Sequence, residues 1–392
     1  MTRSRWILVV AVLGSAAPAE AAPCSDLTNP IYGLGGSAAK PFLGRLSRAL
    51  SSLPGPDTAT IVFQAPGACL GIYGLLDDTA RITGTASFWG PSGVETTCEL
   101  PAAGQPIDFA HMANSAALCA QAPSPLPANI GDFAGAVNTV TLITALASSQ
   151  TVISAPAAYL TFGFGAAGLA APWVNEAALF IRDQNSAVQQ LLGLAINVPA
   201  NKFAFGTNAL NQNGVITGVR NATDPEAALG IVSGEAADAA RATVKILAYQ
   251  HYGQTCGYLP DSTSTSFDKR NVRDGHYFIW TPGHFFTKVD PVTRVVVHPT
   301  VRRVLGYLDG TVESPAGLDT LRIEIESGTV PKCAMKVWRE GDLGAVSRYT
   351  PDESCGCYFD SLTGGTSCQT CQSDGECPSS SPECNHGYCE VQ

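Results

Sequence analysis

The stretch ALFIRDQNSAVQQLLGLAIN, residues 178–197, decides the fold class of this chain. An apolar run ends at Arg182, a short polar turn follows, and an amphipathic segment begins at Ser186. This order predicts a strand, a turn and a helix, which together form the repeating unit of an α/β fold. A helix N-terminus carries free N–H groups and a positive partial charge, so this corner can hold a small anion. Ser186 can equally be a plain helix N-cap, and one side chain can do both.

Two earlier stretches, residues 30–53 and 60–76, repeat this order with glycine in the turn. Each begins with a short strand, predicted at 60–63 in the second stretch, and continues into a helix. The turns contain, in chain order, Gly36, Ser37, Gly67 and Ala68. In an open α/β sheet, such corners gather at the carboxyl ends of the strands, where ligands bind. The sequence therefore predicts an α/β fold with largely parallel sheets.

The remainder of the chain predicts a division into two lobes and a tail. A proline-rich segment, residues 121–133, is typical of a crossover between lobes. Asp224 and Pro225 predict a helix start, and a long alanine-rich helix is expected after a short strand at 229–232. The expected segments are a signal peptide (1–21), the first part of lobe 1 (22–125), lobe 2 (126–271), a return to lobe 1 (272–350) and a cysteine-rich tail (351–392).

The beginning of the chain has the plan of a secretory signal peptide. Arg3 and Arg5 precede an apolar stretch that is too short to span a bilayer, and small residues follow up to Ala21. We therefore expect a soluble bacterial protein that is periplasmic or secreted. The net charge of −10 and the lack of a basic cluster exclude nucleic acid as a partner class.

Thirteen cysteines in an exported chain indicate disulfides, and the odd number leaves at least one thiol unpaired or bridged to another chain. Seven of them lie in the last forty residues. The Cys368-x-x-Cys371 spacing is compatible with zinc, but no matching histidine pair accompanies it, so we expect no metal. The sequence contains no G-x-S-x-G elbow, H-E-x-x-H helix or Walker loop, so we expect neither an enzyme nor a cofactor.

Six motifs follow one another in order: GLGGSAAKPF, IVFQAPGACLG, IDFAHMANSA, ALFIRDQNSAVQQ, ALGIVSG and VRDGHYFIWTP. In this order the chain resembles the type 2 periplasmic solute-binding proteins, most nearly the phosphate-binding subunit of ABC transporters. The resemblance covers residues 28–350. It implies two α/β lobes that are joined by crossover strands and close on a ligand in the cleft between them.

The same resemblance implies roles for single residues. Ser37 falls on a hydroxyl residue that donates to phosphate, Arg182 on the cleft arginine, and Ser186 on the first residue of a Ser-Gly-Thr turn. The match to the family pattern is partial. Ala68 stands where a serine is usual, and Ala187-Val188 follow Ser186 in place of the rest of its turn, so one hydroxyl is missing. Ala113 replaces an aspartate that accepts the proton of bound phosphate. Tight, phosphate-selective binding is therefore not expected.

We predict that a small anion or small polar solute binds in the cleft, that the protein is a monomer, and that a membrane transporter is a candidate partner. The expected ligand-binding residues are Gly36, Ser37, Gly67, Ala68, Asn114, Arg182, Ser186 and Ala187. Two simpler interpretations stay open. Arg182 can instead pair with Asp183 or Glu176 on the surface, and the scaffold can be an extracellular interaction module with a vestigial cleft. His111 and Met112 are expected to be buried neighbours of the cleft.

Overall fold

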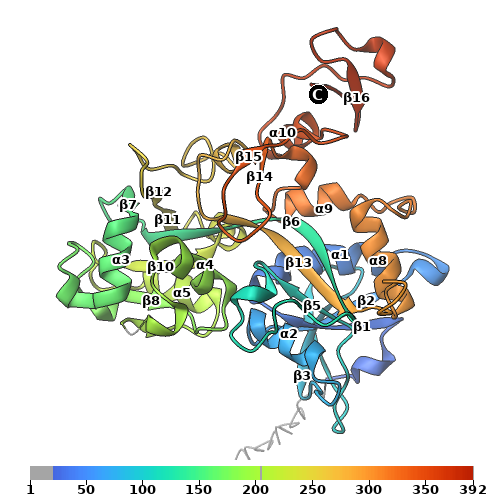
Figure 1. Cartoon of the computed structure of the whole chain (residues 1–392), viewed down its shortest axis with the longest axis horizontal. Helices are drawn as coiled ribbons and strands as arrows, with labels where there is room; N and C mark the ends of the chain where they lie inside the picture. The colour runs from blue at the N-terminus through green and yellow to red at the C-terminus, as the bar shows by residue number, and fades with distance from the viewer. Residues whose placement is uncertain (1–20, 204, 392) are drawn as a thin grey trace, which may run out of the picture.

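The computed structural model describes residues 21–203 and 205–391. The predicted signal peptide lies outside the described residues, apart from Ala21. Figure 1 shows two α/β lobes side by side, with the end of the chain extending away from both. The predicted fold class, a two-lobed α/β arrangement with a disulfide-rich appendage, is confirmed. No helix in the described part is long and apolar enough to cross a membrane.

Lobe 1 is built on one half of the main sheet, whose strands run in the order β4-β3-β2-β1-β5-β13. The strands β1, β2 and β5 are parallel, as the repeated corners predict. Lobe 1 contains the strands β1 (Pro30–Gly35), β2 (Thr60–Gln64), β3 (Thr85–Trp89), β4 (Glu95–Glu99), β5 (Phe109–Met112) and β13 (Trp280–Lys288), and the helices α1 (Lys40–Ser51), α2 (Ala68–Leu76), α8 (Pro299–Asp309) and α9 (Thr320–Glu326).

Lobe 2 is built on the other half, in the order β6-β10-β8-β9, with β11 also paired to β6. A separate two-stranded sheet lies beside it. Lobe 2 contains the strands β7 (Val152–Ser154), β8 (Leu179–Ile181), β9 (Thr207–Asn208), β10 (Leu229–Ser233), β11 (Val244–Ile246) and β12 (Ala248–Gln250), and the helices α3 (Ala155–Phe164), α4 (Ala187–Ile196), α5 (Gln212–Arg220), α6 (Gly234–Ala239) and α7 (Arg270–Arg273).

The strand β6 (Ile130–Ala145) joins the two lobes. Residues 130–139 pair with β13 of lobe 1, and residues 140–145 pair with β10 and β11 of lobe 2. The predicted crossover segment, residues 121–133, contains only the beginning of this strand. Because β6 belongs to both halves of the main sheet and β13 pairs with it along residues 130–139, these two strands are the continuous covalent and hydrogen-bonded links between the lobes.

The predicted corners are present, and local patterning explains them. In α1, Phe42, Leu43, Leu46 and Leu50 recur at helical spacing and are buried, so this helix packs its apolar face on the sheet. In the stretch that decides the fold class, β8 is followed by Arg182, and Ser186 is the N-cap residue of α4.

Two predictions for lobe 2 are wrong. Pro225 lies in a turn rather than at a helix start, because β10 begins four residues later and leaves no room for a helix. The helix after β10 is also short, six residues rather than the expected long one. The segment that follows α6 enters β11, where pairing with β6 overrides the helical propensity of alanine.

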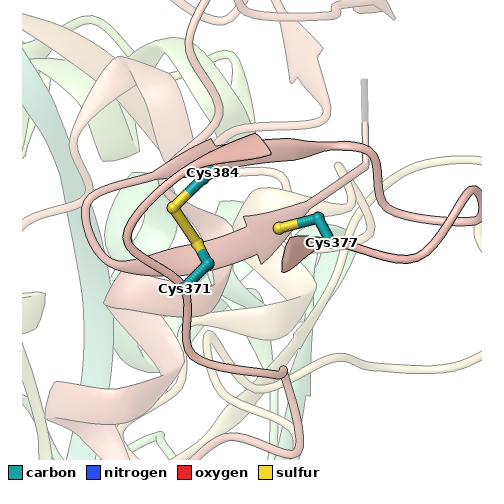
Figure 2. A group of neighbouring side chains, drawn as sticks. All are labelled: Cys371, Cys377 and Cys384. Carbon is teal, nitrogen blue, oxygen red and sulfur yellow. A yellow bond between two sulfur atoms is a disulfide. The ribbon is translucent and has the colours of Figure 1, made fainter. Parts of the chain in front are cut away.

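The cysteines form six disulfides, and Cys256 is free and exposed. The tail holds α10 (Gly356–Thr363), β16 (Glu383–Asn385) and β17 (Tyr388–Glu390), after the short hairpin β14 (Val337–Trp338) and β15 (Ser347–Arg348). The sulfur atoms of Cys371, Cys377 and Cys384 lie within 4.8 Å of one another (Figure 2). Cys371 is bonded to Cys384, and Cys377 to Cys389, so none of the three offers a thiolate to a metal while the disulfides are intact.

Candidate functional site

The two corners expected to face each other across a ligand are in direct contact. The backbone N–H of Cys69, in the first turn of α2, donates to the carbonyl oxygen of Asn185 at 3.3 Å. A Cβ added at Gly67 would lie 3.3 Å from the Cβ of Asn185. Ala187 belongs to the same buried apolar cluster as Ala68. The N-termini of α2 and α4 therefore meet at a lobe-to-lobe contact.

Asn114 forms a second contact between the lobes. It lies just after β5, is fully buried, and donates from Nδ2 to Gln190 Oε1 on α4 at 2.8 Å. Gln190 in turn donates to Cys69 Sγ at 3.0 Å and to the carbonyl oxygen of Gln184 at 2.9 Å. The Oδ1 atom of Asn114 has no hydrogen-bond partner within the described residues. Gln190 thus links α4 by hydrogen bonds both to Asn114, just after β5, and to α2.

Arg182 is buried, with 4% of its surface exposed. Its Nη2 atom donates to the carbonyl oxygen of Leu210 at 3.2 Å, while its Nε atom has no partner in the described chain. Burial lowers the pKa of Arg182, and nearby Asp183 partly opposes this shift. The alternative of a surface ion pair with Asp183 or Glu176 is wrong, because the guanidinium is not on the surface. A buried guanidinium without a carboxylate partner is costly, and an anion would compensate for that cost.

The other predicted residues lie close to this contact. Ser186 is 5% exposed and caps α4 by position, but its hydroxyl makes no capping hydrogen bond. A Cβ added at Gly36 would lie 3.6 Å from the Cβ of Ala68. The structure therefore brings Gly36, Gly67, Ala68 and Ala187 together, whereas the binding role of each stays a prediction.

The segment between β14 and β15 is hydrogen-bonded to lobe 1 next to Asn114. Asp342 accepts hydrogen bonds from the Ser115 backbone N–H at 3.1 Å and from the Ser115 hydroxyl. It also accepts one from the Thr281 hydroxyl, on β13, at 2.7 Å. This carboxylate attaches the segment that leads to the tail both to lobe 1 and to the strand that links the lobes.

A groove of about 910 Å³ lies between the lobes, and Ser37 is one of its lining residues. On the lobe 1 side the lining follows one face of α1 and the turn before it, with the helical spacing Ser37, Lys40, Pro41, Gly44, Arg45 and Arg48. On the lobe 2 side it comes from the start of α5 and from α6, with Asn211, Gln212, Asn213, Glu235, Ala236 and Ala239. The lining of this groove does not include Arg182, so the structure does not place Ser37 and Arg182 on one shared space.

The groove carries more basic than acidic side chains. Lys40 pairs with Glu95, which also lines the groove, at 2.6 Å. Arg45 pairs with Glu326, outside the lining, at 2.8 Å. Arg48 is exposed, and no carboxylate of the described residues lies within ion-pair distance of it. The lining of the groove therefore has a small excess of positive charge, although the whole chain has a net charge of −10.

Glu235 lies where the groove meets a small cavity of about 10 Å³, room for roughly one water molecule. His111 and Asn138 also line this cavity. Glu235 is 4% exposed, and burial raises its pKa to about 7. Burial lowers the pKa of His111 to about 3, so its imidazole is neutral at neutral pH. The expectation that His111 and Met112 are buried is confirmed.

Sequence reasoning missed Glu235. The signal that was present is weak: an acidic residue at the start of a helix, directly after a buried strand, on the same edge as the other corners. An acidic residue at this position usually only complements the helix dipole, so the residue by itself did not indicate a site.

Three solved structures of phosphate-related proteins are similar to this chain. A protein described as a phosphate ABC transporter substrate-binding protein with bound phosphate, from Clostridium perfringens, is 12% identical, with a TM-score of 0.53 over 77% of this chain and 99% of that chain. An ABC-type phosphate transport receptor from Vibrio cholerae (14% identical, TM-score 0.48, 76% and 99% covered) and a human phosphate binding apolipoprotein (14%, 0.48, 77% and 90%) are similar as well. No family model and no curated protein matches the chain. The first similarity confirms the predicted resemblance at the level of the fold.

Proposed function

We propose that this chain is a solute-binding protein that holds a small anion or small polar solute between its two lobes. The observation that carries the proposal is the groove of about 910 Å³, which both lobes line and in which Arg48 lacks a carboxylate partner among the described residues. Its volume is in the range of small-molecule sites, which occur preferentially between domains.

The predicted corner residues enter this proposal through lobe movement. For Arg182, Ser186 and the Gly67–Ala68 turn to reach a ligand, the lobes must separate at the Cys69–Asn185 contact. A solute bound at these corners would therefore favour the separated arrangement, whereas a solute bound in the groove would favour the arrangement in which both lobes line it. The two strands β6 and β13, which link the lobes, are the segments able to bend during such a movement.

We further propose that the protein is exported. Six disulfides are expected to persist only in an oxidising compartment, such as the periplasm or the extracellular space. The phosphate-related proteins with this fold make a membrane transporter the candidate partner. The fold and the groove favour solute binding over the alternative of an interaction module with a vestigial cleft.

Thermal unfolding in the presence of phosphate, sulfate and chloride, at matched ionic strength, tests the proposal. A cleft binder is stabilised by RT ln(1 + [L]/Kd), so we expect a saturable rise in Tm with at least one oxyanion and none with chloride. Arg48→Ala should reduce that rise. The matched control is Arg220→Ala, because Arg220 is exposed at the far end of α5 and does not line the groove. A Tm that stays constant with every small solute would contradict the proposal.

A further inference from the structure

The carboxylate of Glu235 is buried and has no hydrogen-bond partner among the described residues, although it borders the groove. Both of its oxygen atoms are in this state. An unpaired buried carboxylate costs several kcal/mol of stability, so proteins normally pair such a group. A carboxylate left unpaired between two lobes therefore requires a physical explanation.

Three of the donors near Glu235 have other acceptors, although the Ser233 hydroxyl and the backbone N–H of Glu235 itself lie close enough to lower its pKa. The Ser233 hydroxyl donates to Gln212 at 2.7 Å. Across the small cavity, Asn138 donates to the carbonyl oxygen of Ala136 at 3.0 Å. The Thr329 hydroxyl donates to the carbonyl oxygen of Glu324 at 2.9 Å.

The nearby charges do not neutralise it either. Lys269, the cation that acts on Glu235, bonds Asp238 at 2.6 Å and Asp261 at 2.9 Å. Asp238 adds repulsion, and the neutral His111 adds no charge. Among the described residues, no side chain donates a hydrogen bond to this carboxylate and no cation forms an ion pair with it, so a donor group from a solute fits here.

We propose that Glu235 binds an ammonium group of the solute, and that this solute therefore carries an ammonium group next to its anionic group. The proposal rests on the proposed function, because the anionic group is assigned to the basic side of the same groove, at Ser37 and Arg48. An ammonium group leaves no net charge at the buried carboxylate, whereas a hydroxyl group would leave one negative charge buried. The Glu235 carboxylate would repel an anionic group of the solute at this position.

Isothermal titration calorimetry with matched ligand pairs tests this inference. The pairs are taurine against isethionate and 2-aminoethyl phosphate against 2-hydroxyethyl phosphate, which differ only in an ammonium or a hydroxyl group. We expect at least one ammonium ligand to bind about 10- to 100-fold more tightly than its hydroxyl counterpart, the range of a charge-assisted hydrogen bond. In Glu235→Gln this ratio should fall to near one, and in Glu313→Gln, an exposed control, it should not change.

The ratio in the unaltered protein is independent of any effect of the variant on folding. Equal affinities within both pairs would overturn the role of Glu235 and leave the proposed anion site standing. An absence of binding by all four ligands would overturn it as well. A Tm that stays constant with phosphate and sulfate, together with Glu235-dependent binding of an ammonium ligand, would instead overturn the assignment of the anionic group to Ser37 and Arg48 and leave solute binding between the lobes standing.

Discussion

The backbone N–H of Cys69 in lobe 1 donates directly to the carbonyl oxygen of Asn185 in lobe 2, at 3.3 Å. Each of these two atoms belongs to a strand-to-helix corner at which the sequence predicts an anion site. In this arrangement one of the N–H groups that the first turn of α2 leaves free is bonded to protein rather than to a ligand. The contact between the lobes and the binding of a solute at these corners therefore compete for the same donor.

The first prediction concerns the lobe contact made by Gln190. Gln190→Leu removes the acceptor 2.8 Å from Asn114 Nδ2 and leaves the longer hydrogen bond to the Ser115 carbonyl oxygen at 3.4 Å, while Asn114 Oδ1 already lacks a partner among the described residues. We expect the free energy of unfolding to fall by about 1–3 kcal/mol, the cost of a buried unpaired polar group. Urea denaturation measures it. The control Gln121→Leu, at an exposed position, should change the value by less than about 0.5 kcal/mol.

The second prediction concerns the buried ion pairs of lobe 2. Lys269 is 1% exposed and bonds Asp261, which is 1% exposed, at 2.9 Å. Lys269→Met leaves this carboxylate with Arg241 as its ion-pair partner among the described residues and with the backbone N–H of residue 269, so we expect a loss of about 3–5 kcal/mol in chemical denaturation. The neighbouring Arg270→Ala should cost less than about 1 kcal/mol, because that side chain is 67% exposed. If the two variants lost the same free energy of unfolding, burial of the Lys269–Asp261 pair would not explain its contribution.

The third prediction is a pH dependence of stability due to Glu324. Burial raises its pKa from 4.5 to about 8, so the folded state retains a proton that the unfolded state releases. The contribution of protonated Glu324 to the free energy of unfolding is fully present below pH 4.5. It is lost as the pH rises toward 8, at up to about 1.4 kcal/mol per pH unit. Relative to the unaltered protein, Glu324→Gln should gain stability between pH 5 and pH 8 in denaturation series. A difference that is independent of pH would show that Glu324 ionises normally.

The fourth prediction counts thiols. Twelve of the cysteines are paired and Cys256 is exposed, so the native protein should release one equivalent of thionitrobenzoate from Ellman's reagent. Denaturation without a reductant should leave this count at one, and Cys256→Ser should bring it to zero. A count of two or more would contradict the disulfide pattern.

Much of the fold was predictable because its signals are local. The strand, glycine turn and helix of residues 30–53 are encoded by apolar spacing and turn residues within one stretch of chain, and α1 buries the predicted face. The same holds for β8, Ser186 and α4. The failures at Pro225 and after β10 have the opposite cause: pairing of β10 and β11 with the distant strand β6 limits both segments.

The sequence by itself determined the α/β corners, the two lobes and the abundance of disulfides, because these depend on periodicity, turn chemistry and composition. Only the tertiary structure decided which corners meet, that Arg182 is buried, and which cysteine stays free. The structure alone also identified Glu235 as a buried residue. Asn138 and Thr329, which line the same small cavity, lie about a hundred residues before and after it in the sequence. The burial and pairing of a side chain depend on groups that are remote in the chain, and no local pattern records them.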